Sequence, residues 1–522
     1  MHKNIYKWHR SLSLIIAIPA LLWAASGFMH PIMTNIRPAI ATQAYPATHI
    51  DTSKIRISIS AAAKLNGIGY VDNFRFIHID TNWFYQVRES SFATPVYLST
   101  ETGKKLKNGD KLYAQYLAKI FLEGMQTKAD SSDATQASQN QEQHDCCDAA
   151  TRCVLMNQKG APITAVSRVD DFKGEYKSVN RILPVYKVSF DRPDGIRIYV
   201  ETFADKFVYA VDDKRATFDS IFSFFHTFSW LDSIEDIKYL IIILFMMLTM
   251  STAILGIYIF FKTKSKKVPG NKVVSARNNH RVVSVVFSLF TLLFSFSGAY
   301  HAWENSKPDH RYDYFVSLHK NVDSLDLNLS SLESIVHQPI YNVGLVKLGD
   351  DYFWQVDAHA NKNEAIQTSA PKDLMKSMHA SMKEPAYVSF VDMSLLKDGE
   401  KKYAAYLASE FSGNEMNAYK GIEPITKFEG EYGFVNKRLP VWKVKYDVNN
   451  NERYYVETSS GRLSVRIDDA DLWEGYSFSF LHKHHFMDFA GKSWRDFSTM
   501  FWAMGQIALI VTGLVFWLRK KK

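Results

Sequence analysis

The stretch KWHRSLSLIIAIPALLWAASGFMH, residues 7–30, decides the fold of this chain. Its segment 11–29 carries no charged residue and is close to the roughly 20 apolar residues that a helix needs to cross a bilayer. His9 and His30 stand just outside this segment, one at each end. The stretch therefore predicts a transmembrane helix bracketed by two imidazoles.

A second stretch, NNHRVVSVVFSLFTLLFSFSGAYH at residues 278–301, repeats this arrangement with His280 and His301 at its ends. Two further charge-free apolar windows cover about 239–261 and 499–518. The sequence therefore predicts four transmembrane helices. A cleavable signal peptide is the alternative for the first window, and the internal recurrence of a similar segment favours a permanent anchor.

The rest of the chain is too polar to lie in lipid, since the mean hydropathy is −0.18. Basic residues account for much of the net charge of +8 and flank the same side of all four windows. They are Lys3, Lys7, Arg10, Lys262, Lys264, Lys266, Lys267, Lys272, Arg277, Arg281 and Arg519 to Lys522. By the positive-inside rule, both termini and the short middle loop are cytoplasmic, and two large segments lie on the opposite face. No basic patch interleaved with aromatic residues indicates a nucleic-acid partner.

The halves of the chain match each other in order, which indicates an internal duplication. The His-Arg pair, the Ser-Gly pair and the closing histidine of the two quoted stretches are all shifted by the same number of residues. WFYQV matches YFWQV, YAQYLAKIF matches YAAYLASEF, and FKGEYKSVNRILPVYKVSFD matches FEGEYGFVNKRLPVWKVKYD. FSFFH, ending at His226, matches FSFLH, ending at His482.

Each large segment is predicted to be an α+β domain. LPVYKVSFD and RYYVETSSGRLSVRID alternate with the period of half-buried antiparallel strands, and KLYAQYLAKIFLEG has helical spacing. The predicted boundaries are 1–36, 237–262, 281–302 and 497–519 for the transmembrane helices, 263–280 for the cytoplasmic loop, and 37–236 and 303–496 for the two extracytoplasmic domains.

An insertion at about 126–158 is present only in the first half and is rich in Ser, Ala, Gln and Asp, which predicts a flexible excursion. It contains Cys146, Cys147 and Cys153, with His144 nearby. In an oxidising compartment these three cysteines allow one disulfide and a spare thiol, or a soft-metal site. Their spacing matches no structural zinc pattern.

The paired histidines carry the functional hypothesis. His9 and His30 are 21 residues apart, about 31 Å and about 60° around one helix, and His280 and His301 repeat this spacing. Two such helices packed together would present one imidazole pair at each membrane surface, as a bis-histidine haem requires. The alternative is that these histidines anchor the helices at the headgroups.

Other side chains extend this candidate set. His226 and His482 precede the second and fourth windows, and His485 is a further candidate ligand beside the latter. Arg10 and Arg281 are candidates for pairing with haem propionates, with topology as the alternative role.

The chain resembles the PepSY-associated transmembrane family, which includes iron-regulated inner-membrane proteins. The resemblance rests on WHRSLSL…LLWAASG, FSGAYH, the EGEY…LPVWKV…YVET blocks and FLHKHHFMDFAGK, and it covers most of the chain. It implies PepSY-like domains outside the cytoplasm and similarity to siderophore-linked ferric reductases with two b-type haems. It also implies haem ligation at His9, His30, His280 and His301, with His226 and His482 as further candidates.

Two functions follow as hypotheses. In the first, the chain is a di-haem electron-transfer protein of the bacterial inner membrane. It would take electrons from quinol or a cytoplasmic reductant and reduce a ferric chelate, such as a ferric siderophore, on the periplasmic side. In the second, the domains bind a peptide or a partner protein without redox chemistry.

Overall fold

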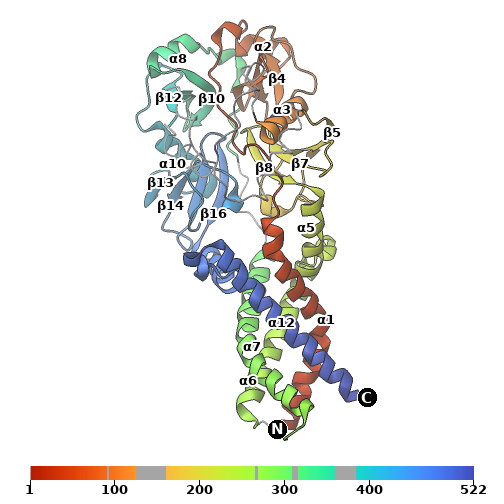
Figure 1. The fold of residues 1–522 in the computed structure, drawn as a ribbon. Coiled ribbons are helices and arrows are strands. Elements are labelled where there is room, and N and C mark those ends of the chain that lie inside the picture. Colours follow the sequence, from red (N-terminus) through yellow and green to blue (C-terminus); the bar gives the residue numbers. More distant parts are fainter. Residues whose placement is uncertain are drawn as a thin grey trace, which may run out of the picture. The chain divides into compact units, whose positions relative to one another are not determined.

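The computed structural model describes residues 2–90, 93–124, 160–264, 268–307, 315–358 and 384–521. They form two compact units. The helical unit comprises Met1–Arg37, Asp213–His310 and Asp469–Lys522, and the sheet unit comprises Pro38–Asp212 and Arg311–Asp468. Figure 1 shows long helices in the first and small sheets with short helices in the second. Each unit is therefore assembled from both halves of the chain.

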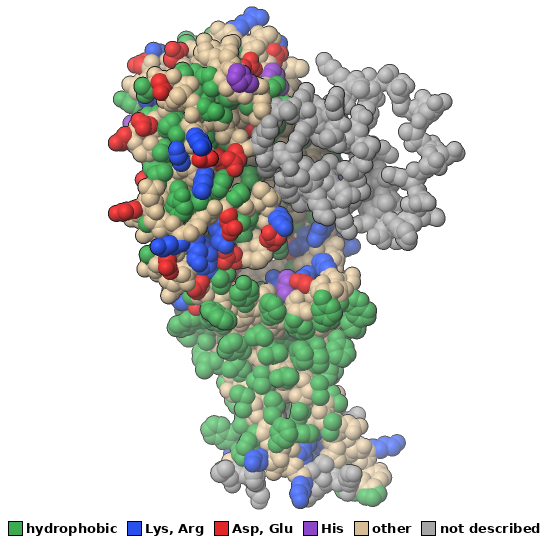
Figure 2. Space-filling model, turned by 90° about the vertical axis from the view of Figure 1, so that its left-hand side faces the viewer, with side chains coloured by type: hydrophobic (Ala, Val, Ile, Leu, Met, Phe, Trp, Pro, Cys, Tyr) green, Lys and Arg blue, Asp and Glu red, His purple; other side chains and the backbone are tan. Residues whose placement is uncertain are grey.

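Four long helices dominate the helical unit: α1 (His2–Asn35), α6 (Glu235–Lys262), α7 (Lys272–Asn305) and α12 (Lys492–Lys521). The apolar spans Asn4–Asn35, Ser229–Lys262, Lys272–Asn305 and Lys492–Leu518 are long enough to cross a membrane. The prediction of four such helices is confirmed. Figure 2 shows apolar side chains over the visible face of this unit.

The four helices pack as a ring in the order α1, α6, α7, α12, because α1 and α7 each contact both α6 and α12. The interior of the ring is closed by a core that includes Trp23, Met246 and Phe294. Consequently α1 and α7, the two helices that carry the bracketing histidines, occupy opposite corners of the bundle.

Short helices complete the helical unit. They are α5 (Asp213–His226), η4 (Ser229–Ile234), α11 (Asp469–Tyr476), the π-helical turn η7 (Ser477–His482) and η8 (His485–Ala490). The boundaries predicted from the sequence assign them to the large domains. The structure groups them with the long helices, because α5 packs on α1 and η7 packs on α7.

The sheet unit contains two three-stranded antiparallel sheets that share one core. The first consists of β2 (Asn73–Ile79), β3 (Asn82–Arg88) and β4 (Val96–Ser99), and the second of β10 (Ile340–Leu348), β11 (Asp351–Ala358) and β12 (Ala386–Ser389). Side chains of both sheets, among them Phe74 and Trp354, pack in the common core with α2 (Ile59–Leu65) and α8 (Leu329–Val336). A short strand pair, β1 (Tyr70–Val71) with β9 (Lys320–Asn321), also joins the two halves.

Two four-stranded antiparallel sheets follow. One has the order β5 (Ile163–Val169), β6 (Val185–Phe190), β7 (Arg197–Glu201) and β8 (Lys206–Val211). The other has the order β13 (Gly421–Ile425), β14 (Val441–Lys445), β15 (Arg453–Glu457) and β16 (Arg462–Ile467). Helix α3 (Gly109–Glu123) packs on the first and α10 (Gly399–Ser412) on the second. The predicted strands at LPVYKVSFD and RYYVETSSGRLSVRID and the predicted helix at KLYAQYLAKIFLEG are confirmed.

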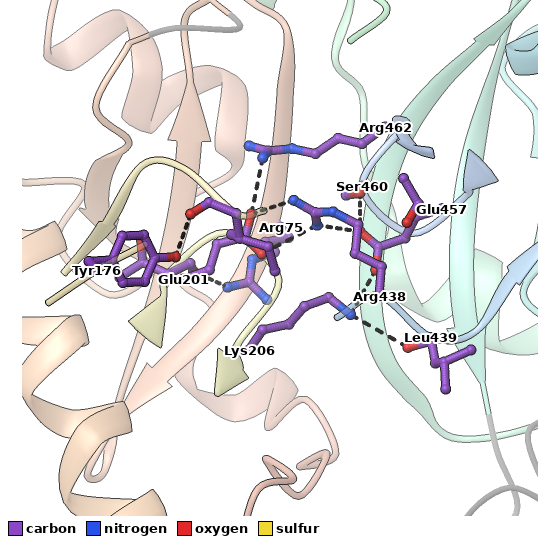
Figure 3. Close-up of polar contacts among 12 residues, drawn as sticks. Arg75, Tyr176, Glu201, Lys206, Arg438, Leu439, Glu457, Ser460 and Arg462 are labelled. Carbon is purple, nitrogen blue, oxygen red and sulfur yellow. Dashed lines mark hydrogen bonds and ion pairs between the residues drawn. The ribbon is translucent and has the colours of Figure 1, made fainter. Parts of the chain in front are cut away.

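A cluster of five charged residues connects the four-stranded sheets of the two halves, and all of them except the partly exposed Lys206 are buried. We call Glu201, Lys206, Arg438, Glu457 and Arg462 the central charge cluster (Figure 3). Lys206 Nζ lies 2.7 Å from Glu457 Oε1, and Arg462 Nη1 lies 3.1 Å from Glu201 Oε1. Arg438 Nη1 lies 2.8 Å from Glu457 Oε2 and 3.4 Å from Glu201 Oε2. Each half therefore supplies the cation for a carboxylate of the other.

This cluster makes the sheet unit sensitive to acid. Burial raises the pKa of Glu457, but Lys206 and Arg438 outweigh burial and lower this pKa to about 2. In an unfolded chain the carboxyl titrates near pH 4.3. The stabilisation is therefore present above about pH 4.5 and is lost as the pH falls towards 2, a change on the order of 3 kcal/mol. We expect thermal melts of the wild type to lose stability over this interval more steeply than melts of Glu457→Gln; parallel loss in both proteins would contradict this account.

Candidate functional site

Two histidines from different halves of the chain meet at one end of the helical unit. His226 is the last residue of α5, and His482 is the last residue of the π-helical turn η7. The centroids of their rings lie 6.0 Å apart, with the ring planes at 80°. Trp23 of α1 stacks on His226 at 5.2 Å and meets the edge of His482 at 6.0 Å. This end of the bundle thus brings two imidazoles together beside an indole.

Each of these imidazoles is held through Nδ1 by the serine of a Ser-Gly pair. His226 Nδ1 lies 3.2 Å from Ser26 Oγ, and His482 Nδ1 lies 3.1 Å from Ser297 Oγ. His226 Nδ1 also lies 3.3 Å from the carbonyl oxygen of Trp23, to which an Nδ1–H donates. A hydrogen bond of this kind fixes the tautomer that leaves the lone pair on Nε2.

Gly27 lets His226 approach α1 closely. A Cβ atom at this position would lie 3.3 Å from Cε1 of His226, which is tighter than ordinary contact. The Ser-Gly pair of α1 therefore has two roles, since its serine orients the ring and its glycine leaves space for it.

Two further histidines flank this pair, each through a phenylalanine ring that lies between it and a central histidine. The ring of Phe222 lies 5.0 Å from His30 and 4.6 Å from His226. In the same way, Phe478 lies 4.3 Å from His301 and 4.9 Å from His482. We call the four histidines His30, His226, His301 and His482 the histidine cluster. The structure brings them to one end of the bundle, with His226 and His482 in the centre.

The sequence predicts that His30 pairs with His301, but no ring contact joins them among the described residues. Each of the two rings lies against a phenylalanine of its own half. His301 is in addition paired with a carboxylate, since its Nδ1 lies 2.5 Å from Glu474 Oε1. The reason is that α1 and α7 occupy opposite corners, and that α5 and η7 insert their own histidines between them.

His9 and His280 lie at the other end of the bundle. Cε1 of His9 would stand 3.4 Å from a Cβ at Gly256 of α6. His280 Nδ1 lies 2.9 Å from Thr512 Oγ1 of α12, and its ring meets the edge of Phe516 at 5.6 Å. Each imidazole therefore packs on the second long helix of its own half. No ring contact joins the two histidines among the described residues.

The comparison with known families agrees with this architecture. The family model described as "PepSY-associated TM region" matches residues 6–520, which is nearly the whole chain. The chain belongs to this family. No match was found among curated proteins.

In this PepSY-associated protein, Arg281 caps a helix. Its Nη2 donates to the carbonyl oxygen of Phe260 at 2.6 Å and also to that of Thr263, at the carboxyl end of α6. Arg10, on α1, is exposed. The role of Arg281 that the structure displays is therefore neutralisation of a helix terminus, where a cation is favourable.

His484, rather than its neighbour His485, faces the interior of the PepSY-associated bundle. His485 lies 2.8 Å from Asp488 and beside Arg495 at the surface. His484 is fully buried and stacks on Phe294, with 5.3 Å between the ring centroids. Its Nδ1 is hydrogen-bonded with Ser498 Oγ, and its Nε2 has no hydrogen-bond partner among the described residues. These neighbours could not be told apart from the sequence, because the turn that buries one and exposes the other depends on the left-handed backbone of His484 (φ 55°).

The cysteine-containing insertion lies outside the part of the chain that the structure describes. His144, Cys146, Cys147 and Cys153 lie outside the described residues. Among the residues that the structure does describe, no group of three or more His, Cys, Asp or Glu side chains is arranged to hold a metal ion. The soft-metal site and the disulfide therefore stay predictions.

Electrostatics keep the central histidines neutral. Burial lowers the pKa of His226 to about 4, against a weaker opposing effect of its hydrogen bond to Trp23. Burial, followed by the nearby His226 and His301, lowers the pKa of His482 well below its ordinary value of 6.5. Both rings are therefore neutral at physiological pH, as an imidazole must be to bind a metal.

The separation of the two central histidines is that of two imidazoles bound to one metal ion. Two imidazole nitrogens on opposite faces of one metal ion stand about 4 Å apart, given a metal–nitrogen bond of about 2 Å, so their ring centroids lie about 6 Å apart. His226 and His482 have this centroid separation, and Nε2 is the nitrogen that both leave available. At the opposite end, the buried Nδ1 of His9 has no hydrogen-bond partner among the described residues. His226 and His482 thus have the separation of two imidazoles on one metal ion, and Trp23, which lies beside both rings, would have to move aside for a macrocycle. His9 and His280 are the candidates for a second site.

Proposed function

We propose that this protein binds two b-type haems within its helical bundle and passes electrons across the membrane to a ferric chelate. The observation that carries the proposal is the meeting of His226 and His482, 6.0 Å apart between their ring centroids. They come from elements 256 residues apart in the sequence, and each is oriented by a serine of a different long helix. An anchoring role at the headgroups would not require two neutral imidazoles to converge.

The chain's own side chains hold and insulate the group. His226 and His482 would bind it through Nε2, while Ser26 and Ser297 keep Nδ1 occupied. Trp23 packs against both rings and excludes water from one side. When bound, haem supplies reversible one-electron chemistry, with a potential tuned by its ligands and their hydrogen bonds.

Aromatic rings fill much of the distance between the two ends of the bundle. From the histidine cluster, contacts of 3.5 to 5.7 Å between ring centroids follow one another along α7. The rings in this order are His482, Phe294, His484, Phe290, Trp502 and Phe287. Phe287 is seven residues from His280, about 10 Å along the helix. The long separation between the two ligand pairs is thus bridged by a polarisable interior rather than by aliphatic side chains alone.

The proposed substrate is a ferric chelate, with a ferric siderophore as the leading candidate, on the side of the large domains. One electron converts the bound ferric ion to ferrous ion, which hard oxygen donors hold far more weakly, so the metal is released. The basic residues around the termini and between α6 and α7 support a cytoplasmic location for that end. We therefore propose the bacterial inner membrane, with the sheet unit in the periplasm.

Absorbance spectroscopy on the full chain tests this function. Detergent-purified protein is expected to show a Soret band that sharpens and shifts on reduction with dithionite, with two haems per chain. Addition of a ferric chelate to the reduced protein should restore the oxidised spectrum while a ferrous-specific chromophore develops. A folded but colourless preparation would overturn the proposal and favour the hypothesis of a domain that binds a peptide or a partner protein. A haem spectrum with no response to ferric chelates would overturn the substrate alone.

A further inference from the structure

The sheet unit contains a pocket of about 410 Å³, which is independent of the haem proposal. Its walls are largely apolar, with Pro95, Leu183, Phe203 and Phe315 among the lining residues. This volume is within the range of small-molecule sites in proteins. Three arginines, Arg88, Arg168 and Arg462, and three acidic residues, Asp110, Asp170 and Glu201, also line it.

Most of these charges are already balanced. Arg168 lies 2.8 Å from Asp170, and Arg462 lies 3.1 Å from Glu201. Asp110 accepts a hydrogen bond from Tyr97 at 2.8 Å. Burial raises the pKa of Asp110.

Arg88 is the exception. It ends strand β3, and only 4% of its surface is exposed. Its Nε and Nη1 have no hydrogen-bond partner among the described residues. The carboxylates of Asp72 and Glu201 act on it, but burial and the cation of Arg462 act more strongly and lower the pKa of Arg88 to about 10. Arg88 therefore remains a buried, charged guanidinium with free N–H groups at neutral pH.

The rings of Phe203 and Phe315 hold this guanidinium in place. Its central carbon lies 4.2 Å from the centroid of Phe203 and 5.4 Å from that of Phe315, and Arg462 lies 3.9 Å from Phe315. Such stacking orients a cation, but a ring face accepts no strong hydrogen bond from Nε or Nη1. Leaving a buried charge unsatisfied costs several kcal/mol, so a position of this kind indicates a missing anionic partner.

We propose that this pocket binds a small organic carboxylate whose carboxyl group pairs with Arg88 and whose apolar body lies against Phe203 and Phe315. The charge of the ligand follows from the two guanidinium nitrogens of Arg88 that have no hydrogen-bond partner among the described residues. Its apolar body follows from the lining, because inorganic phosphate or acetate would leave most of the pocket's apolar surface uncovered.

Thermal melts of the full detergent-solubilised chain test this proposal, with benzoate as the probe and acetate and inorganic phosphate for comparison. Benzoate is expected to raise the Tm by about 2 °C or more at saturation, and acetate and phosphate by less. Arg88→Met should abolish the benzoate response and leave the Tm without ligand unchanged or higher, because this change removes a buried charge without breaking a pair. Arg192→Gln is the control. Arg192 is similarly buried but paired with Asp194 outside the pocket, so this change should lower the Tm and retain the benzoate response.

Two results would overturn the proposal: no response of the wild type to benzoate, or an equal response in Arg88→Met. A response to phosphate equal to that of benzoate would reject the apolar half of the ligand.

Discussion

Replacement of His226 by alanine is expected to remove about half of the haem from the purified protein, and His482→Ala should have the same effect. Under the proposed function, each change deletes one of the two imidazoles that would hold the group, and His30 and His301, the nearest other histidines of the cluster, each lie beyond a phenylalanine ring. The measurement is the haem-to-protein ratio from the absorbance of the reduced haem. Circular dichroism and size-exclusion chromatography of the same preparations should show folded variants, so that the loss of haem does not result from misfolding.

A matched control and a rescue sharpen this prediction. His485→Ala removes a histidine from the same short segment, but one held at the surface by Asp488 and Arg495, and should retain both haems. Free imidazole added to His226→Ala during haem loading should restore part of the lost absorbance, because the deleted ring leaves a space beside Trp23. Unchanged haem content in both His226→Ala and His482→Ala would show that the ligand assignment is wrong.

The same experiment decides between the two pairings of the outer histidines. If His226 and His482 bind the group, His30→Ala and His301→Ala should keep its stoichiometry and change only its potential. Loss of haem in these two variants, with retention in His226→Ala, would support the pairing predicted from the sequence. The separate loss of the second haem in His9→Ala or His280→Ala would identify the ligands at the other end.

Arg438→Met is expected to destabilise the sheet unit by about 3–5 kcal/mol, the usual cost of removing one partner from a buried ionic group. Arg438 is 3% exposed and lies between the carboxylates of Glu201 and Glu457. Without its guanidinium, Glu201 retains Arg462 and Glu457 retains Lys206, but the repulsion between the two carboxylates is no longer offset. Chemical denaturation of the full chain, monitored by tryptophan fluorescence, measures this loss of stability.

The control for this prediction is Arg466→Met. Arg466 lies 3.3 Å from Glu452, but 35% of its side chain is exposed, and the buried Glu452 keeps the hydrogen bond from Tyr454, so we expect a smaller loss than for Arg438→Met. Combining Arg438→Met with Glu457→Gln should recover part of the lost stability, because the second change removes one of the two buried charges. Equal stability of Arg438→Met and Arg466→Met would refute the role assigned to the central charge cluster.

Local pattern was sufficient for the secondary structure of this protein. The long charge-free windows predicted the apolar helices, because a helix that crosses a bilayer needs about 20 predominantly apolar residues in succession. The alternation in LPVYKVSFD predicted β6, because a half-buried strand exposes every second side chain. The boundaries between the membrane helices and the large domains are harder to predict. Helices α5 and η7 are short and polar, and only their packing on α1 and α7 assigns them to the helical unit.

The sequence named the histidines of the candidate site, but not which of them lie next to each other. Sequence alone determined that this is a chain of four apolar helices, that histidines bracket two of them, and that His226 and His482 recur at matched positions, since these properties depend on residue type and spacing. Only the tertiary structure decided that His226 meets His482, that His484 turns inward and that Nε and Nη1 of Arg88 have no hydrogen-bond partner among the described residues. The reason is that such contacts depend on which helices share a corner and which strand ends meet, and residues more than 200 positions apart carry no local signal of their distance in space.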